Sequence, residues 1–284
     1  MKNMRTTPFT SIQKLLANKI PADLIEYLPL KWEKIGDVLL IKLPSELLRF
    51  REIISEIYAQ VLHCKTVLLD NGNIMGVYRE PNVEWIYGSK EIETVHVENG
   101  IRYKLNPQKI MFSSGNMDER IRMGLISNTK ETIVDLFAGI GYFTLPLAVY
   151  SKPKKIYACE INKIAYDYLS QNIVLNDVTE TVEPLIGDNR EIAPENVADR
   201  VLMGYLRDTF EFLPTALNCL KNNIGVIHYH EVCPNTVLPD QPLQKIRDAA
   251  KEYDRTIKLL SYRPVKSYAP GITHAVLDVE IIKP

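Results

Sequence analysis

A short stretch in the middle of the chain restricts the possible folds more than any other part of the sequence. Ile133 and Val134, both β-branched, predict a buried strand, and Asp135 ends it. Gly139 and Gly141 then make a turn into an apolar segment with helical spacing. A strand, a glycine turn and a helix N-terminus form a corner where backbone amides and the helix dipole face a bound nucleotide. Alone, the pattern also fits a plain tight turn.

Two further strand ends carry side chains that suit a nucleoside. The segment 155–160 predicts a second strand that ends in Glu160, whose carboxylate can accept the hydroxyls of a ribose. The segment 185–187 predicts a third strand. It leads to Asp188 and Asn189, which suit the exocyclic amine and the ring of adenine.

The residue at position 144 argues against a dinucleotide. Thr144 stands where the dinucleotide fingerprint has its third glycine, so a cofactor with a pyrophosphate is disfavoured. A strand that ends in an acidic residue before a glycine-rich loop resembles the class I S-adenosylmethionine-dependent transferases. This resemblance implies S-adenosyl-L-methionine as the cofactor.

Alternating strands and helices predict the architecture around this corner. Segments 199–206 and 224–230 predict a fourth and a fifth strand, and segments 256–262 and 275–282 predict a terminal antiparallel hairpin. The expected fold class is α/β: a class I methyltransferase-like Rossmann domain with a mainly parallel sheet and a C-terminal antiparallel hairpin, preceded by a small α+β domain. Ligands of such sheets bind at the carboxyl ends of the strands.

The chain divides into three predicted parts. Residues 1–30 are predicted as a loose N-terminal arm, because they are polar and then mixed, with a short helix indicated by Ile12, Leu15 and Leu16 at helical spacing. Residues 31–105 contain a β-α-β pattern and an Asn99-Gly100 hairpin turn, and predict a small α+β domain that positions RNA or substrate. Residues 106–284 are the predicted S-adenosylmethionine-binding catalytic domain.

Composition narrows the class of protein. The chain has 284 residues, 46% of them hydrophobic and 24% charged, which is typical of a globular protein. No apolar run approaches the ~20 residues that cross a membrane, and the N-terminus lacks the core of a signal peptide, so we expect a cytoplasmic protein. Four isolated cysteines favour reduced, buried thiols and no metal site.

The charge of the chain bears on its partners. A net charge of -1 disfavours indiscriminate nucleic-acid binding, although it permits a local basic face. A monomer is compatible with the sequence.

Several motifs together resemble the archaeal tRNA enzymes that modify the purine 3′ of the anticodon. These motifs are Asn106-Pro107, residues 112–116 with Glu119-Arg120, residues 135–141, residues 199–206 and residues 263–271. The guanine-N1 methyltransferases of this group carry Phe-Ser-Pro-Arg at the linker and Asn-Leu-Pro after the fourth strand. This chain has Phe-Ser-Ser-Gly at 112–115 and Met-Gly-Tyr at 203–205, which is similar to the wybutosine-synthesizing protein 2 family. The resemblance covers residues 35–284.

The resemblance implies an unusual transfer reaction. That family moves the 3-amino-3-carboxypropyl group of S-adenosylmethionine, not its methyl group, to the wyosine precursor 4-demethylwyosine in tRNA-Phe, a step of wybutosine biosynthesis. A sulfonium has three electrophilic carbons, so the geometry of binding decides which group is transferred. The alternatives are a tRNA guanine-N1 methyltransferase that acts at the same position and a protein that binds tRNA and S-adenosylmethionine without turnover.

The resemblance also implies a set of cofactor-binding residues: Ser114, Arg120, Asp135, Gly139, Glu160, Asp188 and Asn189. Ser114 and Arg120 are expected to approach from the linker side, where the planar guanidinium matches a carboxylate. Asp135 is expected to hold the loop or the methionine amine. The alternatives are that Asp135 only caps the turn and that Arg120 pairs with Asp118 or Glu119 on an exposed face. No side chain is predicted to act as a catalytic base.

Basic and aromatic residues outside the glycine corner are candidates for contact with tRNA. They are Lys109, Tyr205, Arg263, Lys266, Tyr268 and His274. Lysine and arginine neutralise phosphates, and tyrosine offers a stacking face to an extruded base. The alternative is that the basic residues form an ordinary solvated surface.

Overall fold

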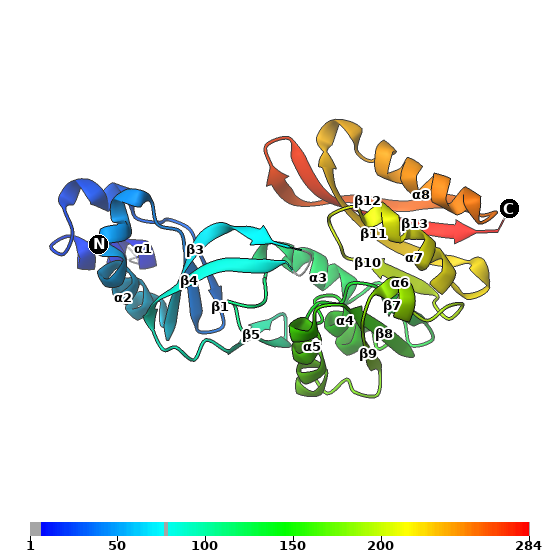
Figure 1. Cartoon of the computed structure of the whole chain (residues 1–284), viewed down its shortest axis with the longest axis horizontal. Coiled ribbons are helices and arrows are strands. Elements are labelled where there is room, and N and C mark those ends of the chain that lie inside the picture. The colour runs from blue at the N-terminus through cyan, green and yellow to red at the C-terminus, as the bar shows by residue number, and fades with distance from the viewer. Residues whose placement is uncertain (1–6, 77–78, 284) are drawn as a thin grey trace, which may run out of the picture. The chain divides into compact units, whose positions relative to one another are not determined.

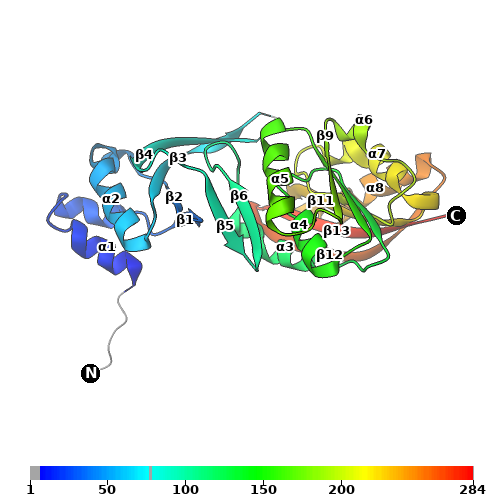
Figure 2. The same cartoon turned by 90° about the horizontal axis from the view of Figure 1, so that it is seen from below.

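The computed structural model describes residues 7–76 and 79–283, which form two compact units whose elements are labelled in Figures 1 and 2. Unit 1 holds the chain up to residue 97 together with residues 103–114. Unit 2 holds residues 98–102 and the chain from residue 115 onward. The division therefore differs from a single boundary at residue 105, because the tip of one hairpin belongs to unit 2 and the linker belongs to unit 1.

Unit 1 is built on a four-stranded sheet. In spatial order its strands are β1 (Trp32–Ile35), β2 (Val38–Ile41), β3 (Thr66–Met75) and β4 (Glu80–Gly88). Strands β2 and β3 are parallel and are connected by a 3₁₀ helix (Ser45–Phe50) and α2 (Arg51–Leu62), whereas the outer pairs are antiparallel. A two-stranded sheet of β5 (Thr94–Glu98) and β6 (Ile101–Leu105) follows. Both residues of its predicted Asn99-Gly100 turn have positive φ, at 47° and 76°.

The short helix predicted in the N-terminal arm is present in the described residues 7–28, where the segment packs on unit 1 and is not loose. They form α1 (Pro8–Leu16), which the Thr7 side chain caps, and a 3₁₀ helix (Ala22–Tyr27). Ile12 and Leu16 are fully buried in the core of unit 1, together with apolar residues of α2 and the sheet. The helix is held by packing of its apolar face, and the partners of that face lie far along the chain.

Unit 2 contains a seven-stranded sheet in the order β12-β13-β11-β10-β7-β8-β9. The strands are β7 (Thr132–Asp135), β8 (Lys155–Glu160), β9 (Val182–Ile186), β10 (Arg200–Met203), β11 (Gly225–Pro234), β12 (Thr256–Ala269) and β13 (Ile272–Ile282). Strands β7 to β11 pair in parallel, and β13 and β12 continue the sheet in antiparallel pairing. The predicted fold class, a mainly parallel sheet with a C-terminal antiparallel hairpin, is confirmed.

Helices cover both faces of the unit 2 sheet. They are α3 (Met117–Met123), α4 (Thr144–Pro146) with a following π-helix (Leu147–Ser151), α5 (Lys163–Leu175), α6 (Asn189–Ile192), α7 (Leu213–Cys219) and α8 (Asp240–Glu252), besides 3₁₀ helices at Ser114–Asn116, Thr209–Phe212, Lys221–Asn223 and Asn235–Val237. Figure 2 shows α4 and α5 on one side of the strands and α7 and α8 on the other. Because both faces are covered, Ile133, Val134 and Val201 of the central strands are fully buried. The carboxyl ends of β7, β8, β9 and β10 meet at one edge of the sheet.

Candidate active site

The glycine corner lies between β7 and α4, and Asp135 holds its two ends together. The carboxylate of Asp135 accepts hydrogen bonds from the Phe137 N–H at 3.2 Å and from the Thr144 hydroxyl at 2.7 Å. The side chain is completely buried, and this burial raises the pKa of Asp135 to about 6. These contacts fit both the expected loop-holding role and the alternative in which Asp135 only caps the turn, and its contact with the methionine amine stays a prediction.

Both glycines of the corner are required by the geometry. Gly139 and Gly141 have φ angles of +59° and +101°, which disfavour any other residue. A Cβ atom at Gly139 would lie 2.5 Å from the Tyr142 ring, and one at Gly141 would lie 2.6 Å from Cγ of Leu145. Glycine at both positions therefore lets the turn pack tightly against Tyr142 and Leu145.

Glu160 lies at the end of β8, beside the glycine corner. Its Oε2 accepts the Gly139 N–H and its Oε1 accepts the Asn162 N–H, each at 2.7 Å. Burial raises the pKa of Glu160 above its usual value. Each carboxylate oxygen has a second lone pair, so the side chain can still accept hydrogen bonds from a ribose.

Asp188 and Asn189 begin α6 at the end of β9. Asp188 caps the helix by accepting the Arg190 N–H at 3.0 Å, and the hydrogen bond and charge of the Arg190 guanidinium lower its pKa. Asn189 is 6% exposed and donates from Nδ2 to the Leu136 carbonyl at 2.9 Å. Its Oδ1 is buried and has no hydrogen-bond partner in the described part of the chain. Such an acceptor suits an amine donor of a ligand.

Two apolar side chains at this edge were not predicted from the sequence. Ile161 follows Glu160 directly and is 44% exposed, and Ile186, paired with Glu160 in the sheet, is 43% exposed. Exposed apolar side chains beside a carboxylate can offer a surface to a flat base. The signal in the sequence was an isoleucine immediately after the strand-end carboxylate.

The side chain of Arg120 contacts Glu98, at the tip of the β5–β6 hairpin. Its Nε and Nη2 atoms donate to the two oxygens of Glu98, both at 2.6 Å, and both side chains are 3% exposed. The predicted alternative, a pair on an exposed face, is therefore wrong, because Arg120 is buried. Ser114 belongs to unit 1, where its N–H donates to Glu33 Oε1 at 2.9 Å.

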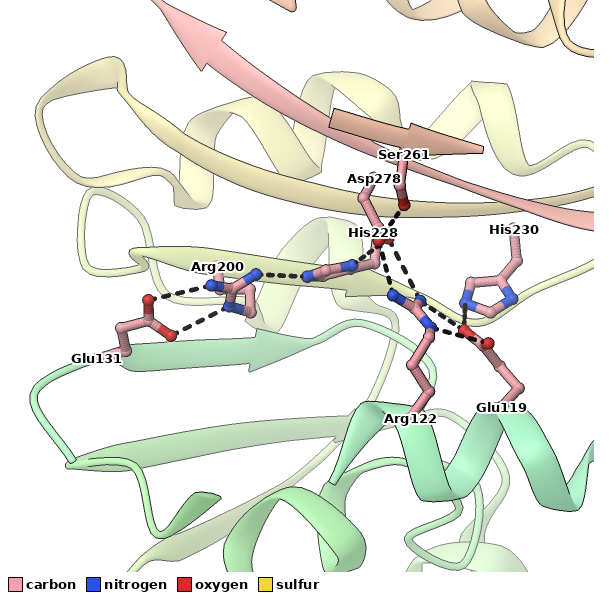
Figure 3. Close-up of polar contacts among 8 residues, drawn as sticks. All are labelled: Glu119, Arg122, Glu131, Arg200, His228, His230, Ser261 and Asp278. Carbon is pink, nitrogen blue, oxygen red and sulfur yellow. Dashed lines mark hydrogen bonds and ion pairs between the residues drawn. The ribbon is translucent and has the colours of Figure 1, made fainter. Parts of the chain in front are cut away.

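A buried ionic network, shown in Figure 3, joins α3 to the strands of unit 2 and was not predicted from the sequence. Its members are Glu119, Arg122, Glu131, Arg200, His228, Ser261 and Asp278. The Arg122 guanidinium binds Glu119 at 2.6 Å and Asp278 at 2.6 Å, and Ser261 donates to Asp278 at 2.7 Å. Burial raises the pKa of Glu119 despite its bonds to Arg122.

Arg200 determines the tautomer of His228 in this network. Arg200 pairs with Glu131 at 3.1 Å and approaches His228 Nε2 at 2.8 Å. A guanidinium can only donate, so Nε2 accepts and Nδ1–H donates to Asp278 at 2.5 Å. Burial opposes ionisation of Asp278, but His228 and Arg122 outweigh it and hold the pKa of that carboxyl well below its usual value.

The candidate tRNA contacts separate into surface and interior residues. Arg263 and Tyr268 lie exposed on the edge strand β12, Lys266 is half-buried on the same strand, and Lys109 is exposed in unit 1. The exposed positions and the half-buried Lys266 are compatible with RNA contact.

Two of these candidates have partners inside unit 2. Tyr205 is half-buried and stacks on Phe137, with centroids 5.0 Å apart. His274 is 2% exposed, and its Nε2 lies 3.0 Å from His230 Nδ1. Because the imidazole is buried, RNA cannot contact it in this conformation.

Among the described residues, no three histidine, cysteine or acidic side chains are grouped so that they could hold a metal ion. Cys159, Cys219 and Cys233 are buried free thiols, and Cys64 is a partly buried one. None of the helices in the described ranges is both long and apolar enough to span a membrane.

Two family models match the chain. The TRM5/TYW2 methyltransferase domain matches residues 94–260, and the TYW2 N-terminal domain matches residues 12–91. The tRNA(Phe) (4-demethylwyosine(37)-C(7)) aminocarboxypropyltransferase of Pyrococcus horikoshii is 44% identical over 272 residues, which cover 96% of each chain.

Two solved structures are similar to the whole chain. A crystal structure of P. horikoshii TYW2 in complex with MeSAdo is 41% identical, with a TM-score of 0.88, and covers 97% of this chain and 100% of its own. A structure of Methanocaldococcus jannaschii TYW2 in complex with AdoMet is 39% identical, with a TM-score of 0.74, and covers 89% of this chain and 100% of its own.

Proposed function

The chain belongs to the TYW2 family, and on that premise we propose that it transfers the 3-amino-3-carboxypropyl group of S-adenosylmethionine to C7 of 4-demethylwyosine in tRNA-Phe. The observation that carries the proposal is the 44% identity to the P. horikoshii aminocarboxypropyltransferase over nearly the full length of both chains. The enzyme class and the cofactor follow from the same relationship.

The residues at the sheet edge fit S-adenosylmethionine. Gly139 and Gly141 adopt positive φ angles and form a tight turn of the kind in which glycine backbone approaches a ligand. Glu160 accepts the ribose hydroxyls, and the buried Oδ1 of Asn189 accepts the adenine amine. Asp135 keeps the corner closed through Phe137 and Thr144. Asp188 holds the first turn of α6 and thereby fixes the place of Asn189.

The choice of transferred group depends on how the methionine end is held. The bound cofactor supplies a sulfonium whose three carbons are all electrophilic, and the one in line with the nucleophile is transferred. Arg120 donates to Glu98 from Nε and Nη2, and a guanidinium has further N–H donors, so a contact of Arg120 with the methionine carboxylate stays a prediction. We expect the methionine chain to point toward the RNA side.

Labelled cofactor tests the proposal directly. S-adenosylmethionine carrying its label either on the methyl or on the carboxyl carbon is incubated with the enzyme and tRNA that contains 4-demethylwyosine. We expect the carboxyl label in the tRNA, and a product nucleoside heavier by one aminocarboxypropyl group in the mass spectrum. A parallel incubation uses tRNA with an unmodified guanine at that position, because 4-demethylwyosine no longer offers a guanine N1. Methyl label in this second tRNA alone would establish the guanine-N1 methyltransferase alternative, and binding without a modified nucleoside in either tRNA would establish the non-catalytic alternative.

Replacing Glu160 by alanine is expected to weaken cofactor binding by about 1–3 kcal/mol, because a charged acceptor of two hydroxyls is lost. Calorimetric titration with S-adenosylmethionine measures the loss. The matched control is Glu183→Ala, because Glu183 lies on the adjacent strand β9 and pairs with Lys155 at 3.0 Å. Equal affinities of the Glu160 variant and the wild type would show that the ribose is held elsewhere.

The double variant Arg263→Ala/Lys266→Ala is expected to bind tRNA less tightly. Each phosphate contact contributes about one unit to the slope of log affinity against log salt concentration, so the slope should fall by about two units. Filter binding at several salt concentrations measures it. The control for loss of charge is Lys251→Ala, because Lys251 is an exposed lysine of α8. An unchanged slope would remove β12 from the RNA-binding surface.

A further inference from the structure

Unit 1 contains a surface groove that is made of none of the residues at the cofactor site. The groove has a volume of about 740 Å³, and all the residues that line it belong to unit 1. They come from the end of β1 and its turn into β2, from the residue before β3, and from the β5–β6 hairpin. The lining side chains include lysines, carboxylates and two exposed valines.

One wall of the groove is fixed, because the turn between β1 and β2 packs directly on β5. The Asp37 N–H donates to Thr94 Oγ1 at 3.2 Å, and the Thr94 hydroxyl donates back to Asp37 Oδ1 at 2.6 Å. The Gly36 N–H donates to His96 Nδ1 at 3.2 Å. A Cβ atom on Gly36 would lie 2.1 Å from Thr94 Oγ1. A ligand therefore meets a surface whose shape is set before binding.

Lys34 contributes an exposed positive charge to the groove. Its Nζ donates to the Leu62 carbonyl at 2.7 Å and to the His63 carbonyl at 3.4 Å, at the C-terminal end of α2. In the described part of the chain, no carboxylate lies within ion-pair distance of this ammonium. An ammonium has three N–H donors. Two of them bind the carbonyls, and the third can bind an anion.

Lys65 adds a second cation immediately before β3. Its Nζ donates to the Glu93 carbonyl at 3.0 Å and pairs with Asp37 Oδ2 at 3.2 Å. The third N–H of this ammonium can also bind an anion. Lys104 lines the groove as well and pairs with the Glu93 side chain at 2.7 Å. Three lysines against two carboxylates leave the groove with an excess of positive charge, which favours an anionic ligand.

Two exposed valines lie in the same groove. Val95 is 42% exposed and Val97 is 61% exposed. They are two residues apart on β5, so both side chains point to the same face of the strand. Apolar surface beside lysines matches a ligand that carries phosphates together with sugars and bases. A small inorganic anion would have no use for the valines.

We propose that this groove binds the sugar-phosphate backbone of the RNA substrate, with a phosphate on Lys34 and Lys65 and a ribose or base against Val95 and Val97. The inference rests on the proposed function, in which tRNA is the substrate, and adds a binding site in unit 1. Phosphate contacts supply affinity without reading the sequence. The groove therefore holds the tRNA and leaves the choice of the modified base to other contacts.

A charge placed at position 97 tests the groove without removing any of its hydrogen bonds. Val97→Glu puts a negative charge beside the proposed phosphate, so the Kd for tRNA at low salt should rise about fivefold or more. Val97→Lys should bind tRNA at least as tightly as the wild type. The matched control is Val174→Glu, because Val174 is 64% exposed on α5 of unit 2. Affinity for S-adenosylmethionine should change less than about twofold in all three variants, since the cofactor carries no phosphate.

Removing the two cations tests the phosphate contacts themselves. In Lys34→Gln/Lys65→Gln, the slope of log affinity for tRNA against log salt concentration should fall by about two units. Glutamine keeps a donor for the carbonyls that both lysines bind. The control is Lys14→Gln/Lys19→Gln, which removes two exposed lysines of unit 1 outside the groove. At saturating tRNA, kcat should stay within about twofold of the wild type, because the lost contacts serve binding.

Thermal unfolding of each variant identifies folding defects, and the Val97 variants decide the matter if the groove lysine variant does not fold. Unchanged tRNA affinity in Val97→Glu would overturn the proposal, as would an equal loss in Val174→Glu. Equal salt slopes in the two lysine variants would overturn it as well.

Titration with inorganic phosphate at constant ionic strength separates RNA from a free anion. If phosphate binding disappears in Lys34→Gln/Lys65→Gln while tRNA affinity is unchanged, the groove is a site for a free anion only and the proposal is wrong. The labelled-cofactor assay on the wild type tests the proposed function separately. Transfer by the wild type, together with normal tRNA binding by the groove variants, would keep that function and remove the groove from it.

Discussion

The variant Arg122→Met is expected to lose about 3–5 kcal/mol of stability, because removing one partner of a buried ionic network leaves the others as uncompensated charges. Arg122 neutralises both Glu119 and Asp278, whose side chains are 2% and 11% exposed. Glu119 is thus almost completely shielded from water and Asp278 is mostly shielded. Urea unfolding at neutral pH measures the loss, which should appear as a lower midpoint with an unchanged slope.

Two further variants show whether the effect comes from buried charge. Lys258→Met removes an ion pair with Glu280 in which the lysine is 67% exposed, so its cost should stay below about 1 kcal/mol. Adding Glu119→Gln to Arg122→Met removes one of the stranded charges and should recover part of the loss. A loss below about 1 kcal/mol in Arg122→Met would mean that water already solvates the network.

The parts of the site that depend on local sequence were predictable. A strand that ends in Asp135 and one that ends in Glu160 are visible as apolar runs that stop at a carboxylate. Parallel strands place such ends at one edge of a sheet. Glu160 indeed lies within hydrogen-bonding distance of Gly139, although nothing in the pattern specified that contact.

Contacts between distant segments were not predictable. Arg122 and Asp278 are separated by 156 positions, and no periodicity links them. The same limit applies to His274: the sequence indicates a hairpin but not that its imidazole lies buried beside His230. Strand β12 is the edge and alternates in exposure, whereas β13 lies between β11 and β12 and is almost entirely buried. The pairing of Arg120 with Glu98 likewise depends on where the hairpin tip packs.

The variant Asp135→Asn is expected to change the pH dependence of stability. The folded pKa of Asp135 is about 6, above its ordinary value of 3.8. Because folding favours the protonated form of Asp135, this carboxyl contributes stability that is fully present below pH 3.8. The contribution is lost as the pH rises through 6. The shift of about two pKa units corresponds to about 3 kcal/mol. Wild type should therefore lose about 3 kcal/mol relative to Asp135→Asn between pH 3.5 and 7.5, as measured by urea unfolding at each pH.

Comparison with a second variant ties this effect to the carboxylate of Asp135. The Thr144 hydroxyl donates to Asp135 and favours its ionised form, so Thr144→Val should raise the folded pKa further and steepen the loss above pH 6. Glu160 and Cys159 are the other titratable groups coupled to Asp135. Because Asp135 raises the pKa of Glu160, a pH dependence that stays in Asp135→Asn but disappears in Glu160→Gln would assign the titration to Glu160 instead. Asp135 would then be ionised over the whole pH range measured. Its hydrogen bonds from Phe137 and Thr144 would offset the free-energy cost of burying the charge.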